Sequence, residues 1–326
     1  MGSTEPDGDA GADIVPLTTA DLSGALTLSA SAQWNQNEAD WRGMLERGRG
    51  WGVLGEAAPS PQPSPASGRG GEAEALAGSV IVRGGSGSGA PVLAASVVVL
   101  PYGASFAWVS MVLVLPAFRR RGYASLLLRH ALAALAKEGR GAVLDATPAG
   151  HAVYVQEGFR DTWGFARYRR EAGAAALPRT GKVTTRAITA ADWPAIDALD
   201  TPTFGASRLE LLRTLAARLP QAARVAESSG RLLGYVVGRD GREASQIGPL
   251  VAEDEATAQA LLADALAAVD GPVYVDLLDV RTGLRAWLEG QGGFALQRPF
   301  TRMVHGLQTA PGDVSRLYAV AGPELG

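Results

Sequence analysis

The pattern of apolar and polar positions predicts strands that alternate with amphipathic helices. Short apolar runs typical of strands lie at 13–17, 51–55, 92–100, 107–115 and 143–145. Helical periodicity appears at 21–28, 38–46 and 125–135. Asp21 stands at the expected N-cap of the first helix. This alternation predicts a mixed α/β (α+β) fold.

The second half of the chain repeats the order of the first. Leu17-Thr-Thr-Ala-Asp-Leu returns as Ile188-Thr-Ala-Ala-Asp-Trp, each time after a strand-like run and before a helix. The helix at 127–135 returns at 261–269, and Gly158-Phe159 returns as Gly293-Phe294. Alanine-rich helices resemble one another easily, but the shared order of these matches favours an internal duplication.

Composition divides the chain further. The 326 residues can form two apolar cores, because 47% of them are hydrophobic. A run rich in proline, serine and glycine near 57–90 predicts a disordered insertion, since it cannot bury enough apolar surface to fold. The expected parts are an N-terminal tail at 1–12, a first domain at 13–172, a linker at 173–181, a second domain at 182–307 and a C-terminal tail at 308–326.

The junction between the strand at 107–115 and the next helix carries the strongest chemical signal. Arg119, Arg120 and Arg121 precede that helix, whose first turn offers unpaired N–H groups and the positive end of its dipole. Small residues at Gly122 and Ala124 leave the backbone donors accessible to a polyphosphate. An isolated motif of this kind also fits a solvated arginine cluster beside an ordinary helix.

Arg119-x-x-Gly122-x-Ala124 after a strand resembles the acetyl-coenzyme A pyrophosphate loop of the GCN5-related N-acetyltransferases (GNAT). Tyr154-x-x-x-Gly158-Phe159 resembles a later segment of the same family. The resemblance implies two tandem GNAT-like domains, each a mixed twisted sheet flanked by helices, and acetyl-coenzyme A as cofactor, with its pantetheine arm in the gap between two splayed strands. It implies cofactor contacts at Val112, Leu113, Val114, Arg119, Arg120, Arg121, Gly122, Tyr123, Ala124 and Ser125.

The second copy lacks this chemistry. Glu253, Asp254 and Glu255 stand opposite the three arginines, so attraction for a phosphate becomes repulsion. Glu289 replaces the tyrosine four residues before its Gly-Phe pair. We therefore expect cofactor binding in the first domain only. The resemblance to tandem members of the family implies that a degenerate second domain completes the acceptor pocket.

Amine attack on a thioester needs a donor for the developing oxyanion and an acid for the departing thiolate. The resemblance implies Tyr154 as that acid, although its ring could simply pack under the Gly-Phe turn. A backbone N–H at or near Val112 is the expected oxyanion donor. No carboxylate precedes the loop on its strand, so the general base stays open, and a water chain can take its place.

Six residues are candidates for the acceptor site: Trp34, Glu38, Asp40, Asp145, Arg208 and Arg302. Capping and core packing also explain the first three, and this interpretation is slightly favoured over acceptor binding. Asp145 also suits a turn, and lone arginines more often form surface or interdomain salt bridges.

Composition and charge exclude several other classes of site and partner. The chain has no cysteine, so disulfides, thiolate metal sites and a cysteine nucleophile are excluded, and its three histidines lack metal-ligand spacing. A net charge of −3 argues against a nucleic-acid partner, and without a targeting or membrane-spanning segment we expect a cytoplasmic protein, monomeric or homodimeric. The expected function is acetyl transfer to a primary amine of a small molecule by direct attack. The alternative is a non-catalytic acyl-coenzyme A sensor or scaffold.

Overall fold

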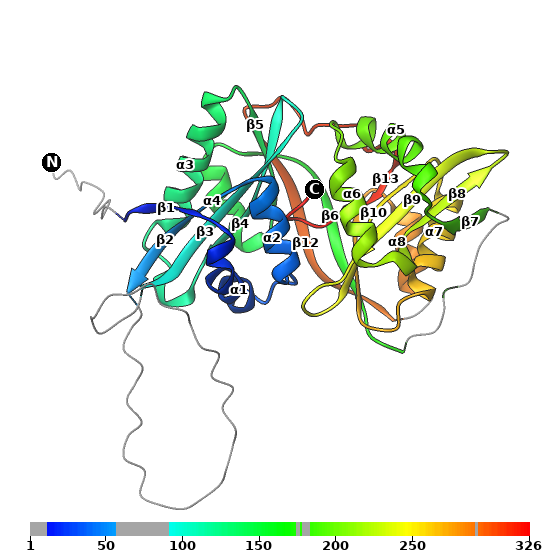
Figure 1. Cartoon of the computed structure of the whole chain (residues 1–326), viewed down its shortest axis with the longest axis horizontal. Helices are drawn as coiled ribbons and strands as arrows, with labels where there is room; N and C mark the ends of the chain where they lie inside the picture. Colours follow the sequence, from blue (N-terminus) through cyan, green and yellow to red (C-terminus); the bar gives the residue numbers. More distant parts are fainter. Residues whose placement is uncertain (1–11, 57–90, 174–176, 178–182, 291–292) are drawn as a thin grey trace, which may run out of the picture.

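The computed structural model describes residues 12–56, 91–173, 177, 183–290 and 293–326. The predicted insertion at 57–90 lies outside them, as do nearly all of the N-terminal tail and most of the linker. Within the described chain, a single sheet of thirteen strands runs through both halves (Figure 1), in the order β1-β2-β3-β4-β5-β12-β6-β11-β13-β10-β9-β8-β7. No helix in these ranges is long and apolar enough to cross a membrane.

The first half closely follows the predicted elements. It contains β1 (Ile14–Leu17), α1 (Leu22–Ser31), α2 (Glu38–Arg47), β2 (Arg49–Glu56), β3 (Pro91–Tyr102), β4 (Phe106–Val114), α3 (Tyr123–Lys137), β5 (Gly141–Ala146), α4 (Pro148–Gln156) and β6 (Arg160–Arg170). Asp21 is the N-cap residue of α1, as predicted, but its side chain makes no capping bond to this helix. It accepts a hydrogen bond from the Thr18 N–H at 2.8 Å, and Thr18 caps a short 3-10 helix, which makes the pair a capping box.

The second half repeats this layout. It contains β7 (Thr184–Ala187), α5 (Trp193–Phe204), α6 (Leu209–Arg218), β8 (Arg224–Ser228), β9 (Arg231–Arg239), β10 (Ser245–Ala252), α7 (Glu255–Ala267), β11 (Val273–Leu278), α8 (Thr282–Gly290), β12 (Phe294–His305) and β13 (Leu317–Ala319). The same capping box recurs before α5, where the Thr189 N–H donates to Asp192 at 2.7 Å. The sequence repeat therefore encodes the same local structure twice.

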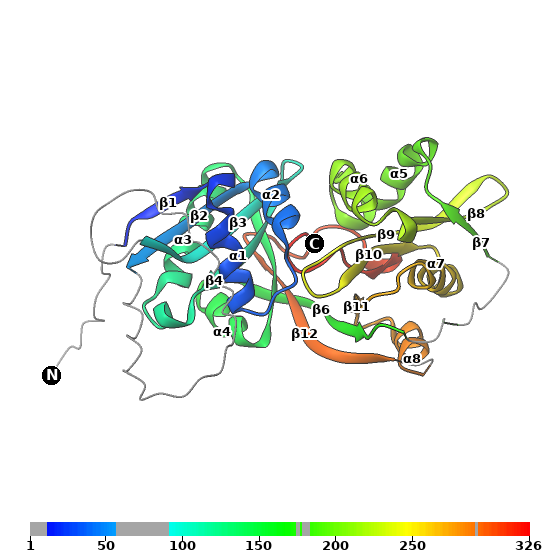
Figure 2. The same ribbon diagram turned by 60° about the horizontal axis from the view of Figure 1, so that its bottom comes forward.

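The long apolar run in β3 is explained by helices on both faces of the sheet (Figure 2). Val98 and Leu100 pack into the core that holds Trp41 and Met44 of α2. Val97 and Val99 point to the other face, where the leucines of α3 cover them. Because successive side chains of a strand alternate between faces, a strand covered on both sides becomes apolar throughout.

The two halves exchange their long strands. β12 leaves the second half and lies between β5 and β6, and it pairs Arg302 with Asp145 of β5. In turn, β6 pairs along β11 of the second half, from Phe165 to Arg170. Figure 1 shows both strands crossing the middle of the molecule. The boundary near residue 172 is therefore not a division between two independent sheets.

The end of the described chain also belongs to the fold. β13 lies in the sheet between β10 and β11, pairing Leu250 and Leu277 with Ala319. Glu324 is 1% exposed and forms an ion pair with buried Arg239 of β9. The interpretation of 308–326 as a tail was wrong, because these residues fill a gap in the sheet and the interface between the halves.

Candidate active site

The strands β4 and β5 separate at the predicted position. They pair in parallel only from Phe106 to Trp108, opposite Gly141 to Val143. Beyond this, Met111 adopts a positive φ of 52°, the β3–β4 register shifts, and the Ser96 hydroxyl donates to the Met111 carbonyl at 2.7 Å. A bulge bends a strand and re-aims its edge. Val112 to Val114 thus have no pairing with β5.

A cavity of about 520 Å³ occupies this gap. Five of the predicted cofactor residues line it: Val112, Leu113, Val114, Arg119 and Ala124. Residues of the first turn of α4 and Tyr154 also line it. The remaining predicted cofactor residues, Arg120, Arg121, Gly122, Tyr123 and Ser125, occupy the adjoining loop and the first turn of α3.

The start of α3 is an open anion site. Gly122 is the N-cap residue, with a left-handed φ of 77°, and no side chain caps the helix. A Cβ built on Gly122 would meet nothing within 4 Å. The three arginines before it are exposed and have no carboxylate partner among the described residues. Unpaired N–H groups, the helix dipole and three cations all favour a pyrophosphate here.

Replacing Gly122 with glutamate is expected to abolish coenzyme A binding. The side chain would place a carboxylate in the open space where the phosphates fit, and the left-handed backbone would be strained by about 1–2 kcal/mol. Gly139→Glu is a matched control, because Gly139 follows α3 with φ 67° and equally open surroundings. Calorimetry should show binding to the control and none to Gly122→Glu. Equal affinity in both variants would rule out the anion site.

Tyr154 lies in the last turn of α4 and lines the cavity. Gly158 has a φ of 85°, the Phe159 N–H donates to the Tyr154 carbonyl at 3.0 Å, and the Gly158 N–H donates to Val155 at 3.1 Å. These two bonds form a Schellman motif. Burial raises the pKa of Tyr154 to about 12, and its hydroxyl has no hydrogen-bond partner among the described residues. Tyr154 is therefore a protonated donor facing the gap.

Asp145 and Arg302 form a buried ion pair with each other. The Arg302 Nε and Nη2 atoms donate to the two Asp145 oxygens, both at 2.9 Å, and the guanidinium stacks between Trp108 and Trp163. The Asp145 side chain has 0% exposure, so the residue lines the cavity through its backbone. Burial raises the pKa of Asp145, and Arg302 opposes that shift. The turn interpretation of Asp145 was wrong, and the pair ties β12 to β5.

Three other acceptor candidates lie away from the cavity: Glu38, Arg208 and, as described below, Asp40. Glu38 is exposed and pairs with Arg42 at 2.6 Å. Arg208 is 4% exposed and donates to Asp200 at 2.9 and 3.0 Å. Each of these charges is already neutralised within the described chain.

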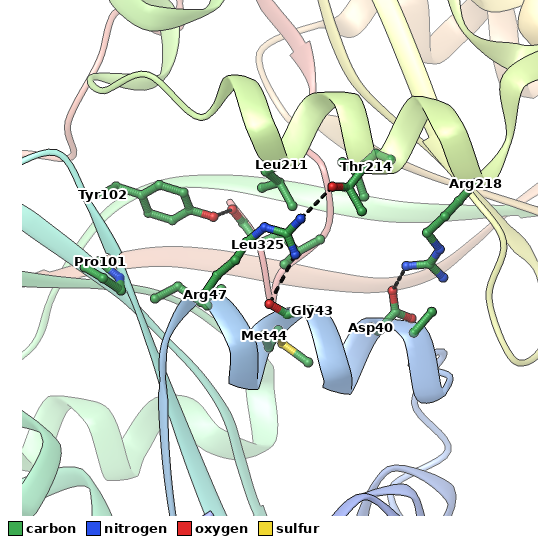
Figure 3. Close-up of a pocket in the computed structure, with 13 residues that line it drawn as sticks. Asp40, Gly43, Met44, Arg47, Pro101, Tyr102, Leu211, Thr214, Arg218 and Leu325 are labelled. Atoms are coloured by element: carbon green, nitrogen blue, oxygen red, sulfur yellow. Dashed lines mark hydrogen bonds and ion pairs between the residues drawn. The ribbon is translucent and has the colours of Figure 1, made fainter. Parts of the chain in front are cut away.

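Asp40 lies at the interface between the two halves. It pairs with Arg218 of α6 at 2.5 Å and with Arg239 at 2.8 Å. Figure 3 shows it beside a separate cavity of about 70 Å³, lined by Met44 of α2 and Leu211 of α6. The Asp40 carboxylate therefore connects the halves and does not reach the gap between β4 and β5.

Trp34 is, after Asp145, the second acceptor candidate that lines the cavity, and Arg298 of β12 also lines it. The second half holds the Trp34 segment in place. The buried Asn35 side chain donates to the Ala244 carbonyl at 2.9 Å and accepts from the Glu243 and Ala244 N–H groups at 2.9 and 3.1 Å. Sequence reasoning missed Arg298, because only the strand exchange brings it to the first half.

The equivalent gap in the second half is closed. Asp254 caps α7 and accepts from the Thr257 N–H at 2.8 Å, so a carboxylate occupies the position where a phosphate would bind. β10 and β11 pair in parallel only from Ser245 to Ile247, and β13 then fills the space between them. Both changes oppose cofactor binding in the second half.

Comparisons with known proteins agree with this geometry. Two family models match the chain, each described as an acetyltransferase (GNAT) domain, over residues 79–161 and 196–319. No curated protein sequence matches. A crystal structure of a putative acetyltransferase from Pyrococcus horikoshii superposes with a TM-score of 0.69 at 17% identity, covering 100% of this chain and 99% of that one.

Two further structures share the arrangement. A GCN5-related N-acetyltransferase from Sphaerobacter thermophilus superposes with a TM-score of 0.58 at 15% identity, covering 92% of this chain and 97% of that one. A tandem GNAT protein from the clavulanic acid biosynthesis pathway gives 0.53 at 17% identity, covering 90% and 98%. At such identities the structural likeness shows the fold, and the sequence matches in both halves show the family. The chain belongs to the GNAT acetyltransferase family, as a tandem member with two GNAT domains in one polypeptide.

Proposed function

We propose that this protein transfers an acetyl group from acetyl-coenzyme A to a primary amine of a small molecule by direct attack. The observation that carries the proposal is the gap between β4 and β5, with an uncapped helix start at one end and the Tyr154 hydroxyl across it. When bound, acetyl-coenzyme A supplies the acetyl group as a thioester.

The residues of the first half fit this molecule in two places. The α3 N–H groups and Arg119 to Arg121 suit the pyrophosphate, because they offer donors and positive charge with no carboxylate partner among the described residues. The β4 edge at Val112 to Val114 suits the amide-bearing pantetheine arm, because its backbone groups face the cavity without pairing to β5.

Two groups would then assist the reaction. A backbone N–H at or near Val112 donates to the carbonyl oxygen as negative charge develops there. The Tyr154 hydroxyl holds a proton at neutral pH and can deliver it to the departing thiolate. Among the described residues that line the cavity, Asp145 is the sole acid, and its carboxylate has no exposed surface, so water is the expected acceptor of the amine proton.

We expect one coenzyme A per chain. The second half presents Asp254 at the helix start and β13 in the strand gap, and each opposes binding. Isothermal titration calorimetry should give a stoichiometry near one, and Gly122→Glu should remove all binding. A second equivalent site, or residual binding of full stoichiometry in this variant, would contradict the assignment to the first half.

The transfer itself is tested by screening amines for thiol release from acetyl-coenzyme A. Turnover with at least one small amine, detected as the acetylated product by mass spectrometry, supports an N-acetyltransferase. Tight coenzyme A binding with no turnover on any amine would favour a non-catalytic sensor or scaffold instead.

A further inference from the structure

Besides Arg119, the cavity contains a second arginine, Arg298, that forms no ion pair within the described chain. Arg298 of β12 is half-buried, and it has no ion pair or hydrogen bond within the described chain. Two nearby buried arginines differ from it. Arg167, which stands opposite Arg298 in the β6–β12 ladder, is bonded to Asp276 at 2.7 Å through two nitrogens, and Arg302 is bonded to Asp145. No carboxylate of the described chain lies at ion-pair distance from Arg298, although Asp276 and Glu243 attract its charge from farther away.

The environment makes this charge costly. Burial and the like charge of Arg167 lower the pKa of Arg298. Partial removal from water weakens the solvation of a guanidinium, and a nearby positive charge adds repulsion. An anion bound at this point would remove both costs. The planar guanidinium of Arg298 presents a fork of N–H donors that suits two oxygens of a carboxylate or phosphate.

Arg298 also lies on the acceptor side of the cavity. It lines the main cavity with Trp34 and Tyr154, and it lines a much smaller adjoining hollow with Trp34 and Gln36. The pyrophosphate loop contributes Arg119 to the main cavity and nothing to the hollow. Arg298 thus also faces a hollow that the predicted pyrophosphate loop does not line.

The hollow contains a second unsatisfied group. Gln36 is 1% exposed, and its Oε1 atom accepts no hydrogen bond from any described residue. A buried acceptor without a donor is unfavourable, so such an atom is a natural partner for a ligand N–H or O–H group. Arg298 and Gln36 thus line the same small hollow, together with Trp34.

We propose that the acceptor is a small amine that also carries an anionic group, a carboxylate or a phosphate, which Arg298 binds beside Trp34 and Gln36. This inference rests on the proposed acetyl transfer and specifies its acceptor class. The anionic group would anchor the molecule at the wall formed by the second half, and its amine would extend toward Val112 and Tyr154. The degenerate half would then select the acceptor that the first half acetylates.

Matched substrate pairs test this proposal. Standard amino acids are compared with their carboxamides, and phosphoethanolamine with ethanolamine, by thiol release from acetyl-coenzyme A. The anionic member of at least one pair should have a kcat/KM at least about tenfold higher. The pair that shows the difference distinguishes carboxylate from phosphate. Equal turnover of both members in every pair would overturn the proposal.

Variants assign the preference to Arg298. Arg298→Gln should lower the anionic-to-neutral ratio of kcat/KM about tenfold or more, and Arg298→Lys should have an intermediate effect, because lysine keeps the charge and loses the fork. Arg213→Gln removes an exposed arginine of α6 and should leave the ratio unchanged. Calorimetry with coenzyme A reports whether each variant is folded. An unchanged ratio in folded Arg298→Gln would contradict the role of this residue.

A binding experiment keeps the two proposals separate. If no amine is acetylated, the acetyl-transfer proposal fails, and N-acetyl amino acids and their neutral carboxamides are titrated into protein saturated with coenzyme A. Binding of the carboxylates alone, lost in Arg298→Gln, would still support the anion subsite. Equal binding of both sets, or of neither, would overturn it.

Discussion

Tyr154→Phe is expected to lower turnover about 100-fold or more while coenzyme A affinity hardly changes. The phenylalanine ring keeps the packing against Phe159, whose ring centroid lies 6.0 Å away, and the backbone bonds of the helix end remain. Only the hydroxyl is lost. Because this hydroxyl has no partner in the described chain, its removal breaks no hydrogen bond within that part of the protein.

Steady-state kinetics measures the turnover of the variant, and calorimetry measures its affinity for coenzyme A. The kcat should fall, the dissociation constant for coenzyme A should stay within about twofold, and Tyr168→Phe, a change outside the cavity, should retain activity. The pKa of Tyr154, about 12, keeps the hydroxyl protonated at neutral pH, so the ratio of wild-type to variant turnover should not vary between about pH 6 and 9. A fully active Tyr154→Phe enzyme would remove this residue from the mechanism.

Local features of the first half were predictable from sequence because neighbouring residues determine them. The Thr-x-x-Asp pattern forms a capping box in both halves, at Thr18 and at Thr189. Gly158 ends α4 because a left-handed residue is needed there, and this places Tyr154. The small residues before α3 likewise follow from the backbone conformation of one turn.

The acceptor site was less predictable because its charges find partners far away in sequence. Asp40 bonds Arg218 and Arg239, and Arg302 crosses to Asp145, so local patterns could not show that these groups are already paired. Arg298 was missed for a similar reason. The alternating pattern of β12 would allow this strand to pair with either half, and which half it joins depends on tertiary contacts that the sequence pattern does not show.

The exchange of strands leads to the second large expectation: a fragment ending at residue 172 should not fold. It would lack β12, which lies between β5 and β6 and pairs with both, so β6 would no longer be joined to the rest of the first-half sheet. The Asp145 carboxylate would lose Arg302, and Phe165 would lose Phe300, with which it stacks at 5.0 Å. Breaking a buried ion pair alone costs about 3–5 kcal/mol, a large fraction of typical domain stability.

Circular dichroism and calorimetry of the fragment measure this directly. We expect no cooperative thermal transition and no coenzyme A binding, although the fragment retains every predicted cofactor residue. Coexpression with residues 173–326 should restore both properties, because the second fragment supplies β12 and the partners of Asp145 and Asp40. A fragment that melts near the temperature of the full chain would mean that the first half is an independent domain. The strand exchange would then contribute little to the stability of the first half, and the Asp145–Arg302 ion pair would not be needed to hold its sheet together.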